Sequence, residues 1–173
     1  MGAESFYWIR GPWPGRLAIV PRPRGGDWLE EEVDAWAREG LEVIVSLLTS
    51  DEAAELELTK EAELSRSKGL EFCSFPIPDL GVPASRAETL QVVKELDRHL
   101  RAGKSIGIHC RQGIGRSGLI AACLLVLAGE APDEVFDRIS EARGRPVPET
   151  MEQREWVEAF APELAASTFE RRR

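Results

Sequence analysis

The sequence predicts an α/β domain with a mostly parallel central sheet flanked by helices. Three observations indicate this fold class. Short apolar segments, several rich in β-branched residues, alternate with longer segments whose apolar residues recur at helical spacing. Glycine, proline and helix-capping residues separate most of these segments. Near the middle of the chain, an apolar strand, a glycine-containing loop and an apolar helix follow directly on one another, and strand–helix alternation is typical of parallel sheets.

The first part of the chain is expected to hold an arm, a strand and a helix. Residues 1–14 are rich in aromatic residues, proline and glycine. We expect them to form an arm that packs on the domain, with an aromatic lid over a binding site as the alternative. Residues 17–20 are apolar and end at two closely spaced prolines, which predicts a strand. Asp27 is placed to cap a helix over residues 28–39.

Two further strands and three helices are expected before the central strand. Residues 41–48 are apolar and β-branched, and residues 70–77 alternate between polar and apolar, so both segments are predicted to be strands. Capping residues indicate three helices: residues 52–58 after the capping stretch 49–51, a short helix between Thr59 and Gly69, and a helix from Ser85 to Arg101.

The remaining elements complete the alternation of strands and helices. The composition of residues 105–109 predicts a short buried strand. Residues 119–128 are apolar all round, which predicts a helix buried in the core. Helices over residues 132–143 and 149–160 follow, with a turn between them that contains glycine and proline.

The loop after residues 105–109 combines a nucleophile with groups that bind an anion. It runs from His109 to Gly118 as His-Cys-Arg-Gln-Gly-Ile-Gly-Arg-Ser-Gly. Helix-terminal N–H groups favour anions, and the glycines allow the backbone to approach a ligand closely. Arg116 can hold two phosphate oxygens at once. Cys110 lies at the floor of this cradle, where positive charge favours the nucleophilic thiolate; an inert buried cysteine is the alternative.

The pattern His-Cys-x5-Arg-Ser resembles the active-site loop of the protein tyrosine phosphatase superfamily. The chain's size and motif spacing resemble the small atypical dual-specificity phosphatases over most of residues 15–160. The resemblance implies a dual-specificity-phosphatase-like fold, with Cys110 attacking phosphorus, Arg116 holding the phosphoryl oxygens and His109 ordering the loop. Ser117 could donate a hydrogen bond to the sulfur. The phosphate-binding residues would be Arg111, Gln112, Gly113, Ile114, Gly115 and Arg116.

This resemblance leads us to expect three regions in the chain. They are an N-terminal arm over residues 1–14, a single phosphatase-like catalytic domain over residues 15–162 and a C-terminal tail over residues 163–173. We expect His109 to hydrogen-bond carbonyls of its own loop.

The cleavage of a phosphate ester also needs an acid that protonates the leaving oxygen. Asp79 is our choice, because it follows a predicted strand, lies in a proline-stiffened loop and precedes Cys110 by 31 residues (110 − 79). Its surroundings, Phe-Pro-Ile-Pro-Asp, resemble the general-acid loop of small dual-specificity phosphatases. A turn aspartate that bonds its own backbone is the alternative, and Asp51 and Asp27 are second choices for the acid.

Gln153 is a candidate for positioning the hydrolytic water. The role is implied only by resemblance, since some relatives use a late glutamine in this way. An exposed helix glutamine explains the residue equally well. We expect no metal and no cofactor, because arginine and backbone amides supply the positive charge that the reaction needs.

These residues predict a cysteine-dependent phosphatase whose substrates are phosphotyrosine and also phosphoserine or phosphothreonine. The reaction is expected to pass through a thiophosphoryl-enzyme intermediate. One alternative is a phosphatase for phosphoinositides or other small phosphate esters, although the loop holds Arg111, Gln112 and Ile114 rather than the lysines of lipid-directed relatives. A non-catalytic phosphate-binding module is another. Sulfur-transfer and arsenate-reducing enzymes also use cysteine–arginine loops but fit the upstream acid less well.

Composition bounds the partners and the compartment. The chain has 173 residues and a formal net charge of −8, which disfavours nucleic acid as a partner. No apolar run reaches the roughly 18 residues of a membrane span. Three cysteines give neither a disulfide framework nor a metal-ligand spacing, so we expect a reducing, cytoplasmic compartment and a monomer whose substrate is a phosphorylated protein or a small phosphate ester.

Three further side chains invite a prediction. Cys73 could form a protective disulfide with Cys110 on oxidation, or could be an ordinary core residue. Cys123 lies in the buried helix and is expected to be inert. His99 is expected at the surface.

Overall fold

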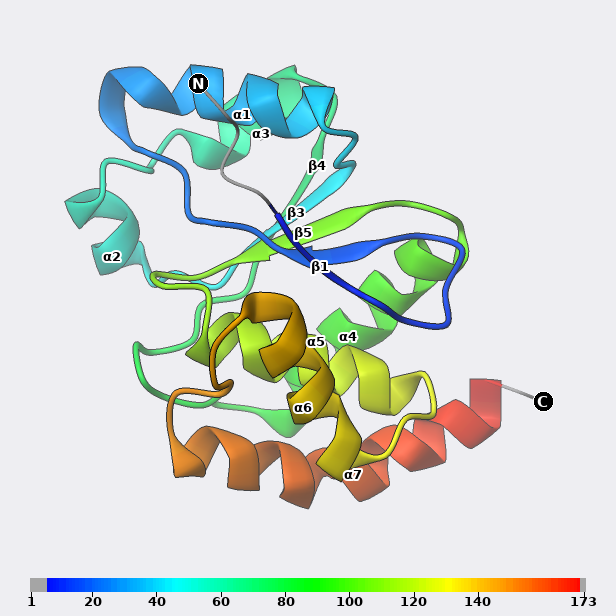
Figure 1. The fold of residues 1–173 in the computed structure, drawn as a ribbon. Helices are drawn as coiled ribbons and strands as arrows, with labels where there is room; N and C mark the ends of the chain where they lie inside the picture. The colour runs from blue at the N-terminus through cyan, green and yellow to red at the C-terminus, as the bar shows by residue number, and fades with distance from the viewer. Residues whose placement is uncertain (1–5, 172–173) are drawn as a thin grey trace.

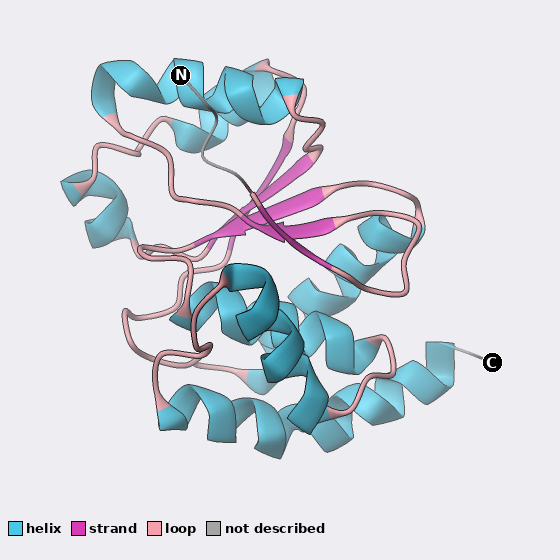
Figure 2. Cartoon of the chain, viewed as in Figure 1, coloured by secondary structure: helices cyan, strands magenta, loops and turns pink. Residues whose placement is uncertain are grey.

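A computed structural model of the chain describes residues 6–171 and contains one five-stranded sheet (Figures 1 and 2). The strand order is β1-β2-β5-β3-β4, and the four strands β2, β5, β3 and β4 run parallel to one another. The predicted mostly parallel sheet is therefore confirmed. The strands are β1 Tyr7–Ile9, β2 Leu17–Ile19, β3 Val43–Ser46, β4 Glu71–Ser74 and β5 Ile106–His109.

Helices cover both faces of this sheet (Figure 1). One side carries α1 and α3, and the other carries α4, α5, α6 and α7. The bounds are a 3₁₀ turn η1 Gly26–Trp28, α1 Leu29–Arg38, α2 Ser50–Glu55, α3 Glu61–Ser67, α4 Arg86–Arg101, α5 Gly115–Leu127, α6 Pro132–Arg143 and α7 Met151–Arg171. Within the described residues, no helix has the length and apolarity that crossing a bilayer would require.

Alternate residues of each strand enter two separate cores, because successive side chains point to opposite faces of a sheet. Leu17 and Ile19 of β2 join the core on the α5 side. Ala18, between them, joins the smaller core under α1, together with Ile44 of β3. The apolar, non-alternating composition of the strands follows from this burial on both faces.

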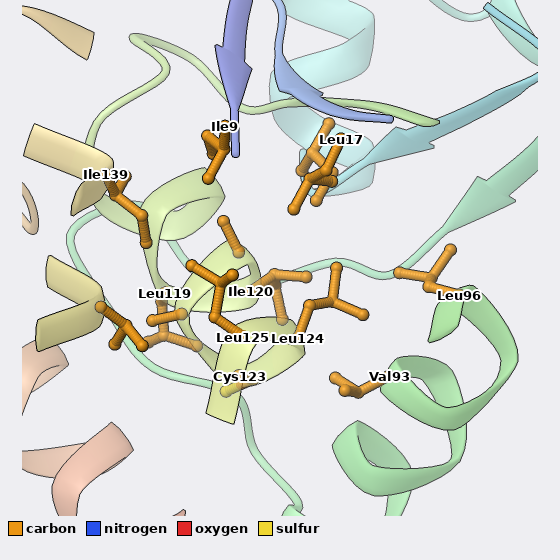
Figure 3. Packing of buried hydrophobic residues seen from close by; sticks show 14 of the residues in the cluster. Ile9, Leu17, Val93, Leu96, Leu119, Ile120, Cys123, Leu124, Leu125 and Ile139 are labelled. Atoms are coloured by element: carbon orange, nitrogen blue, oxygen red, sulfur yellow. The ribbon is translucent and has the colours of Figure 1, made fainter. Parts of the chain in front are cut away.

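Helix α5 lies at the centre of the larger core and is buried along its whole length. Its residues Ile120 and Leu124 lie in one cluster with Leu17 of β2 and with Val93 and Leu96 of α4 (Figure 3). Helices α4, α6 and α7 all contact it. A helix surrounded in this way needs apolar residues on every side, as the sequence indicated. It begins four residues earlier than the predicted 119–128.

Two ends of the chain differ from expectation. Tyr7–Ile9 pairs antiparallel with β2 and forms an edge strand that we did not predict, because three residues are too few to show alternation. The helix expected to end at residue 160 continues to Arg171, so the predicted tail is wrong over its described part: Leu164 is fully buried, and Ser167 and Thr168 are nearly so. Residues 1–5 of the predicted arm and residues 172–173 of the tail lie outside the described residues.

Helix capping was predicted correctly at two of four sites. Thr49 forms a reciprocal capping box with Glu52 at the start of α2, and the Ser85 hydroxyl accepts from the Glu88 amide at the start of α4. Asp27 does not cap α1 but lies in the first turn of η1. A negative charge at this position stabilises the N-terminal end of a helix. The Thr59 prediction is also wrong, since Lys60 takes the N-cap position of α3 without a side-chain bond.

Candidate active site

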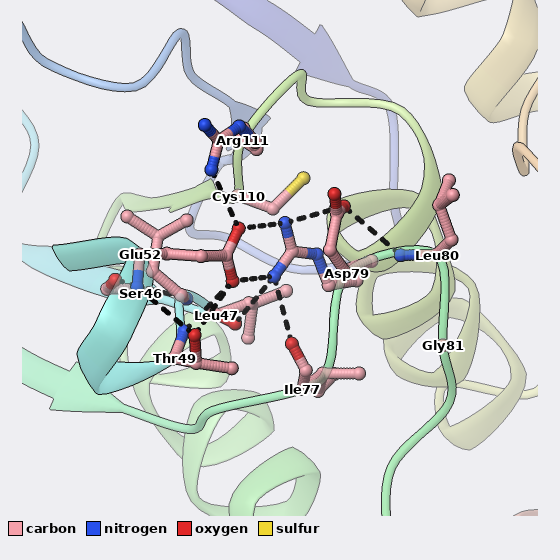
Figure 4. A network of polar contacts seen from close by, with 12 residues as sticks. Ser46, Leu47, Thr49, Glu52, Ile77, Asp79, Leu80, Gly81, Cys110 and Arg111 are labelled. Carbon is pink, nitrogen blue, oxygen red and sulfur yellow. Dashed lines mark hydrogen bonds and ion pairs between the residues drawn. The ribbon is translucent and has the colours of Figure 1, made fainter. Parts of the chain in front are cut away.

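Three loops meet at one edge of the sheet because β3, β4 and β5 run parallel and end together. Cys110 follows β5 directly. The segment after β3 brings Glu52, and the segment after β4 brings Asp79. Figure 4 shows the side chains of these three residues close together, and Arg116 bonds both Glu52 and Asp79. The fold thus joins residues that lie far apart in the sequence.

The Cys110 loop is closed by its own backbone. The amide of Gly113 donates to Cys110 Sγ at 3.2 Å, and Cys110 is 3% exposed. Gly113 has a positive φ of 69°, a conformation that glycine adopts without strain. Since α5 starts at Gly115, the N-terminal N–H groups of a 13-residue helix lie directly after the loop. The predicted strand–loop–helix arrangement is confirmed.

Arg143 at the end of α6 fixes the direction of two peptide units in this loop. Its Nε donates to Gly113 O at 3.0 Å, and its Nη2 donates to Gln112 O at 3.2 Å. In a trans peptide the N–H points away from the C=O. The two carbonyls face Arg143, so the amides of Gly113 and Ile114 face the opposite way, and the first of them bonds Cys110 Sγ. Sequence reasoning missed Arg143, which offered no local signal.

The Arg116 guanidinium is buried, with 2% exposure, and is bonded on several sides. Its two terminal nitrogens donate to both carboxylate oxygens of Glu52, at 2.6 and 2.9 Å. Nη1 also donates to Ile77 O at 2.9 Å, and Nη2 donates to Asp79 Oδ1 at 3.0 Å (Figure 4). Two carboxylates therefore hold the cation in place at the mouth of the loop.

Glu52 is the second residue that sequence reasoning missed, because its place in the capping box of α2 already accounts for it. The hydrogen bond from Arg116 is the largest cause that lowers the pKa of Glu52, from its ordinary value to about 2, and bonds from Thr49 add to it. A carboxylate with a lowered pKa stays ionised and keeps the buried arginine compensated at neutral pH.

Glu52→Gln is expected to lower the free energy of unfolding by about 3–5 kcal/mol near neutral pH, since it leaves a buried guanidinium without its main partner. Because the folded-state pKa lies below the unfolded one, the wild-type advantage is present above about pH 4 and is lost as pH falls toward 2. Urea unfolding near pH 7 and near pH 3 measures the difference, which should shrink at the lower pH.

Glu55→Gln is the matched control for that change. Glu55 lies one turn further along α2, is 66% exposed in its side chain and pairs with Arg111 at 3.2 Å. Exposed pairs contribute at most about 1 kcal/mol. Equal losses of stability for the two variants, or a Glu52 effect that does not change with pH, would contradict the role given to the buried pair.

Asp79 is brought to the site, as its position after β4 predicted. Its side chain is 51% exposed, and its Oδ1 accepts from Arg116 and from the Leu80 amide at 3.1 Å. The backbone bond was the expected alternative for a turn aspartate, and both contacts are present. Asp51 and Asp27, the second choices, lie exposed in the first turns of α2 and η1, and neither contacts Arg116.

His109 does not bond its own loop, contrary to expectation. As a residue of β5 its ring points to the opposite face of the sheet from the Cys110 side, where Nε2 lies 2.5 Å from Glu61 of α3. The ring stacks on Trp36 with centroids 6.0 Å apart. Strand alternation explains the error, since the side chain directly before the loop belongs to the α1 face. His109 thus ties β5 to α1 and α3.

Ser117 lies in the first turn of α5 and is fully buried. Its hydroxyl has no hydrogen-bond partner within the described part of the chain. The bond to the Cys110 sulfur that we considered is not formed here, where the Gly113 amide is the group that reaches Sγ.

Gln153 is fully buried, so the exposed-glutamine alternative is wrong. Its Nε2 donates to Gly81 O at 3.1 Å, and its Oε1 accepts from the Thr150 amide at 3.2 Å. A methyl group at Gly115 would lie 2.8 Å from either end of this amide. Gln153 therefore lies between the Asp79 loop and the first residue of α5.

The register of the sheet excludes a disulfide between Cys73 and Cys110. Cys73 pairs with Val45, and Val45 pairs with Ile108, two residues before Cys110. Two strand spacings place the Cα atoms roughly 10 Å or more apart, whereas a disulfide needs less than about 7 Å. All three cysteines are free thiols. Burial raises the pKa of the Cys123 thiol well above its ordinary value, which agrees with the inert role expected for it.

His99 is less exposed than we expected. Its side chain is 16% exposed, and Nε2 lies 3.2 Å from Glu71 and 3.7 Å from Glu95. It belongs to the contact between α4 and the β4 edge and lies away from the catalytic loop.

Comparison with known proteins places this site in context. The chain is 30% identical over 129 residues to cyclin-dependent kinase inhibitor 3 of Sus scrofa, and the match covers 73% of this chain and 60% of that relative. A crystal structure of kinase associated phosphatase, with its catalytic-site cysteine replaced by serine, aligns with a TM-score of 0.85 at 24% identity and covers 94% and 96% of the two chains. Tk-PTP in its active form aligns with a TM-score of 0.73 at 28% identity, covering 94% and 97%.

The fold is that of the small protein-tyrosine/dual-specificity phosphatases. The resemblance stated from the loop motif is thereby confirmed. The chain belongs to the family described as "Polymorphic toxin system, DSP-PTPase phosphatase", whose model matches residues 20–130. It spans about 60% of the length of the Sus scrofa relative.

Proposed function

We propose that this phosphatase hydrolyses phosphotyrosine in proteins, and also phosphoserine or phosphothreonine, through a cysteine-bound intermediate. The observation that carries the proposal is that Cys110 lies at the same edge of the sheet as Arg116 and Asp79, which are bonded to each other. A nucleophile, an oxyanion-binding cation and a carboxyl group are the parts that phosphate-ester cleavage needs.

In the first step Cys110 Sγ attacks phosphorus and the ester oxygen leaves with its electron pair. Asp79 supplies the proton to that oxygen. The amides of Gly113 and Ile114, directed by Arg143, and the Arg116 guanidinium stabilise the charge on the equatorial oxygens. In the second step a water molecule gives a proton to Asp79 and attacks phosphorus, and the thiolate leaves. The reaction restores every group.

The bond between Asp79 and Arg116 has a consequence for this cycle. Arg116 Nη2 donates both to Glu52 and to Asp79 in the structure. A phosphoryl group held by Arg116 competes with the Asp79 carboxylate for the same donor. Substrate binding therefore favours release of Asp79 from Arg116, which frees its carboxyl group for the leaving oxygen. Asp79 is half exposed and its loop lies at the surface, so this movement meets little packing resistance.

Hydrolysis of a chromogenic aryl phosphate by the reduced protein tests the proposed reaction. Acid quenching during turnover should leave a phosphoryl group on the peptide that contains Cys110, detectable by mass spectrometry. A protein that binds vanadate but releases no product would instead be a phosphate-binding module. Turnover of phosphoinositides in preference to phosphopeptides would favour the lipid-directed alternative.

Gln153 is proposed to position the water of the second step, and its buried place between the Asp79 loop and Gly115 supports this. Gln153→Ala is expected to slow hydrolysis of the intermediate more than its formation. The fraction of phosphorylated Cys110 in the acid-quench experiment should therefore rise above that of the wild type. A fall in turnover with no rise in that fraction would assign Gln153 a structural role only.

The compartment and the oligomeric state are also proposals. A reducing compartment such as the cytoplasm suits the three free thiols, one of which the proposed reaction requires. We propose a monomer, since the residues of the site all come from one chain.

A further inference from the structure

Tyr7, on the edge strand β1, lies against the guanidinium of Arg143. The guanidinium carbon is 4.0 Å from the centre of the Tyr7 ring, well within the roughly 6 Å over which an aromatic face attracts a cation. Both residues are half-buried, which strengthens such a contact relative to an exposed one. Arg143 forms no ion pair with any residue in the described part of the chain. The ring and two carbonyls of the catalytic loop therefore hold it in place.

Arg143 connects the Tyr7 ring to the catalytic loop. One face of its planar guanidinium lies on the ring, and its nitrogens donate to Gly113 O and Gln112 O at 3.0 and 3.2 Å. The loop is packed closely at this point, since a methyl group at Gly113 would lie 3.2 Å from Ile19 of β2 and 3.8 Å from Arg143 Nε. Ile19 is also the residue that pairs with Tyr7 across the two strands. Strand, arginine and loop thus form one continuous cluster.

The strand that carries Tyr7 is itself fixed against α6. Ile9 of β1 and Ile139 of α6 belong to the same core cluster (Figure 3). Directly after the strand, Arg10 O accepts from Arg138 Nη1 at 3.2 Å. The Tyr7 ring therefore has a defined place relative to the helix end from which Arg143 extends.

We propose that Tyr7 is a positioning residue for the phosphatase reaction. Its ring holds Arg143 in the orientation that directs the amides of Gly113 and Ile114 toward the phosphoryl group. This inference rests on the proposed function and adds to it a control of the loop by the first strand of the chain. Hydrogen bonds weaken steeply as they depart from linear geometry, so less well directed amides stabilise the transition state less.

Variants of Tyr7 test this role through the aromatic face. Tyr7→Leu removes the face and keeps an apolar side chain, and should lower kcat/KM for an aryl phosphate and the affinity for vanadate about three- to tenfold. Tyr7→Phe keeps the face and should retain wild-type values. Incorporation of phenylalanines with one, two and three ring fluorines at position 7 withdraws charge from the face at nearly constant shape. Both values should then fall progressively, which a purely structural role would not produce.

Trp8→Leu is the matched control. Trp8 is the next residue of β1, points to the opposite face of the sheet and carries the guanidinium of Arg16 over its ring at 4.1 Å. The variant removes a contact of the same kind from the same strand, away from the catalytic loop. It should leave kcat/KM and vanadate affinity unchanged, even where thermal unfolding shows an equal loss of stability.

Hydrogen exchange of the Gly113 amide, followed by NMR without ligand, separates this inference from the proposed function. The amide bonds Cys110 Sγ and should exchange about three- to tenfold faster in Tyr7→Leu than in wild type or Trp8→Leu. Faster exchange supports the positioning of the loop by Tyr7 even if wild type hydrolyses nothing, a result that would reject only the proposed function. Equal exchange in the two leucine variants, values that fluorination does not change, or faster exchange with unchanged kcat/KM in an active enzyme would overturn the proposal.

Discussion

Replacing Cys110 with serine is expected to lower aryl phosphate hydrolysis by about 10⁴-fold or more. A serine hydroxyl is a much weaker nucleophile toward phosphorus than a cysteine sulfur. Serine fits the space of Cys110, so the loop should keep its shape and its affinity for vanadate. Steady-state hydrolysis and vanadate binding, measured on the same preparation, separate lost chemistry from lost binding.

Cys73→Ser is the matched control for this change. Cys73 lies on the edge strand β4, two strands away from β5, the strand that Cys110 follows. Its replacement should leave turnover near that of the wild type, and the oxidised wild type should contain no disulfide between the two residues. Comparable losses for both variants would mean that the cysteine effect is structural and would remove Cys110 from its catalytic role.

Asp79→Asn is expected to reduce kcat by about 10²–10⁴-fold on substrates with poor leaving groups, because proton transfer to the leaving oxygen is lost. The loss should be smaller on aryl phosphates with acidic leaving groups, which depart without a proton. The pH–rate profile should also change, because the leaving oxygen no longer receives its proton from this side chain. Hydrolysis of a series of aryl phosphates across pH measures both effects.

Asp51→Asn is the control for Asp79, since Asp51 is an exposed carboxylate at the start of α2 without a bond to Arg116. It should leave the profile unchanged. An Asp79 variant whose loss is the same for every leaving group would indicate that the residue acts only by holding Arg116, to which it is bonded at 3.0 Å.

Much of the reacting centre could be predicted from the sequence because its parts are local. Cys110, Arg116 and the N-terminus of α5 lie within a few residues, so their mutual placement depends on one turn of backbone. The apolar composition of α5 predicted its burial on all sides. Asp79 was found because strand ends of a parallel sheet meet at one edge.

The errors in the prediction have two physical causes. His109 follows the strand periodicity to the α1 face, although its neighbour in sequence is the nucleophile. The extension of α7 past Pro162 depends on the surface that α5 offers, and burial of Leu164 there stabilises residues that look like a tail in isolation. Tyr7–Ile9 becomes a strand because β2 presents an edge for pairing. At α7 and at Tyr7–Ile9, tertiary contacts override local propensity.

The fold class, the anion-binding loop with its nucleophile and the carboxyl group of Asp79 could all be predicted from the sequence. The residues that surround them are set by contacts between distant parts of the chain. Glu52 compensates Arg116 from 64 residues away, Arg143 directs the loop amides from about 30 residues away, and Gln153 bonds the Asp79 loop across 72 residues. Such partners carry no local pattern, because a buried charge or carbonyl is satisfied by whichever chain segment the fold brings within hydrogen-bond distance.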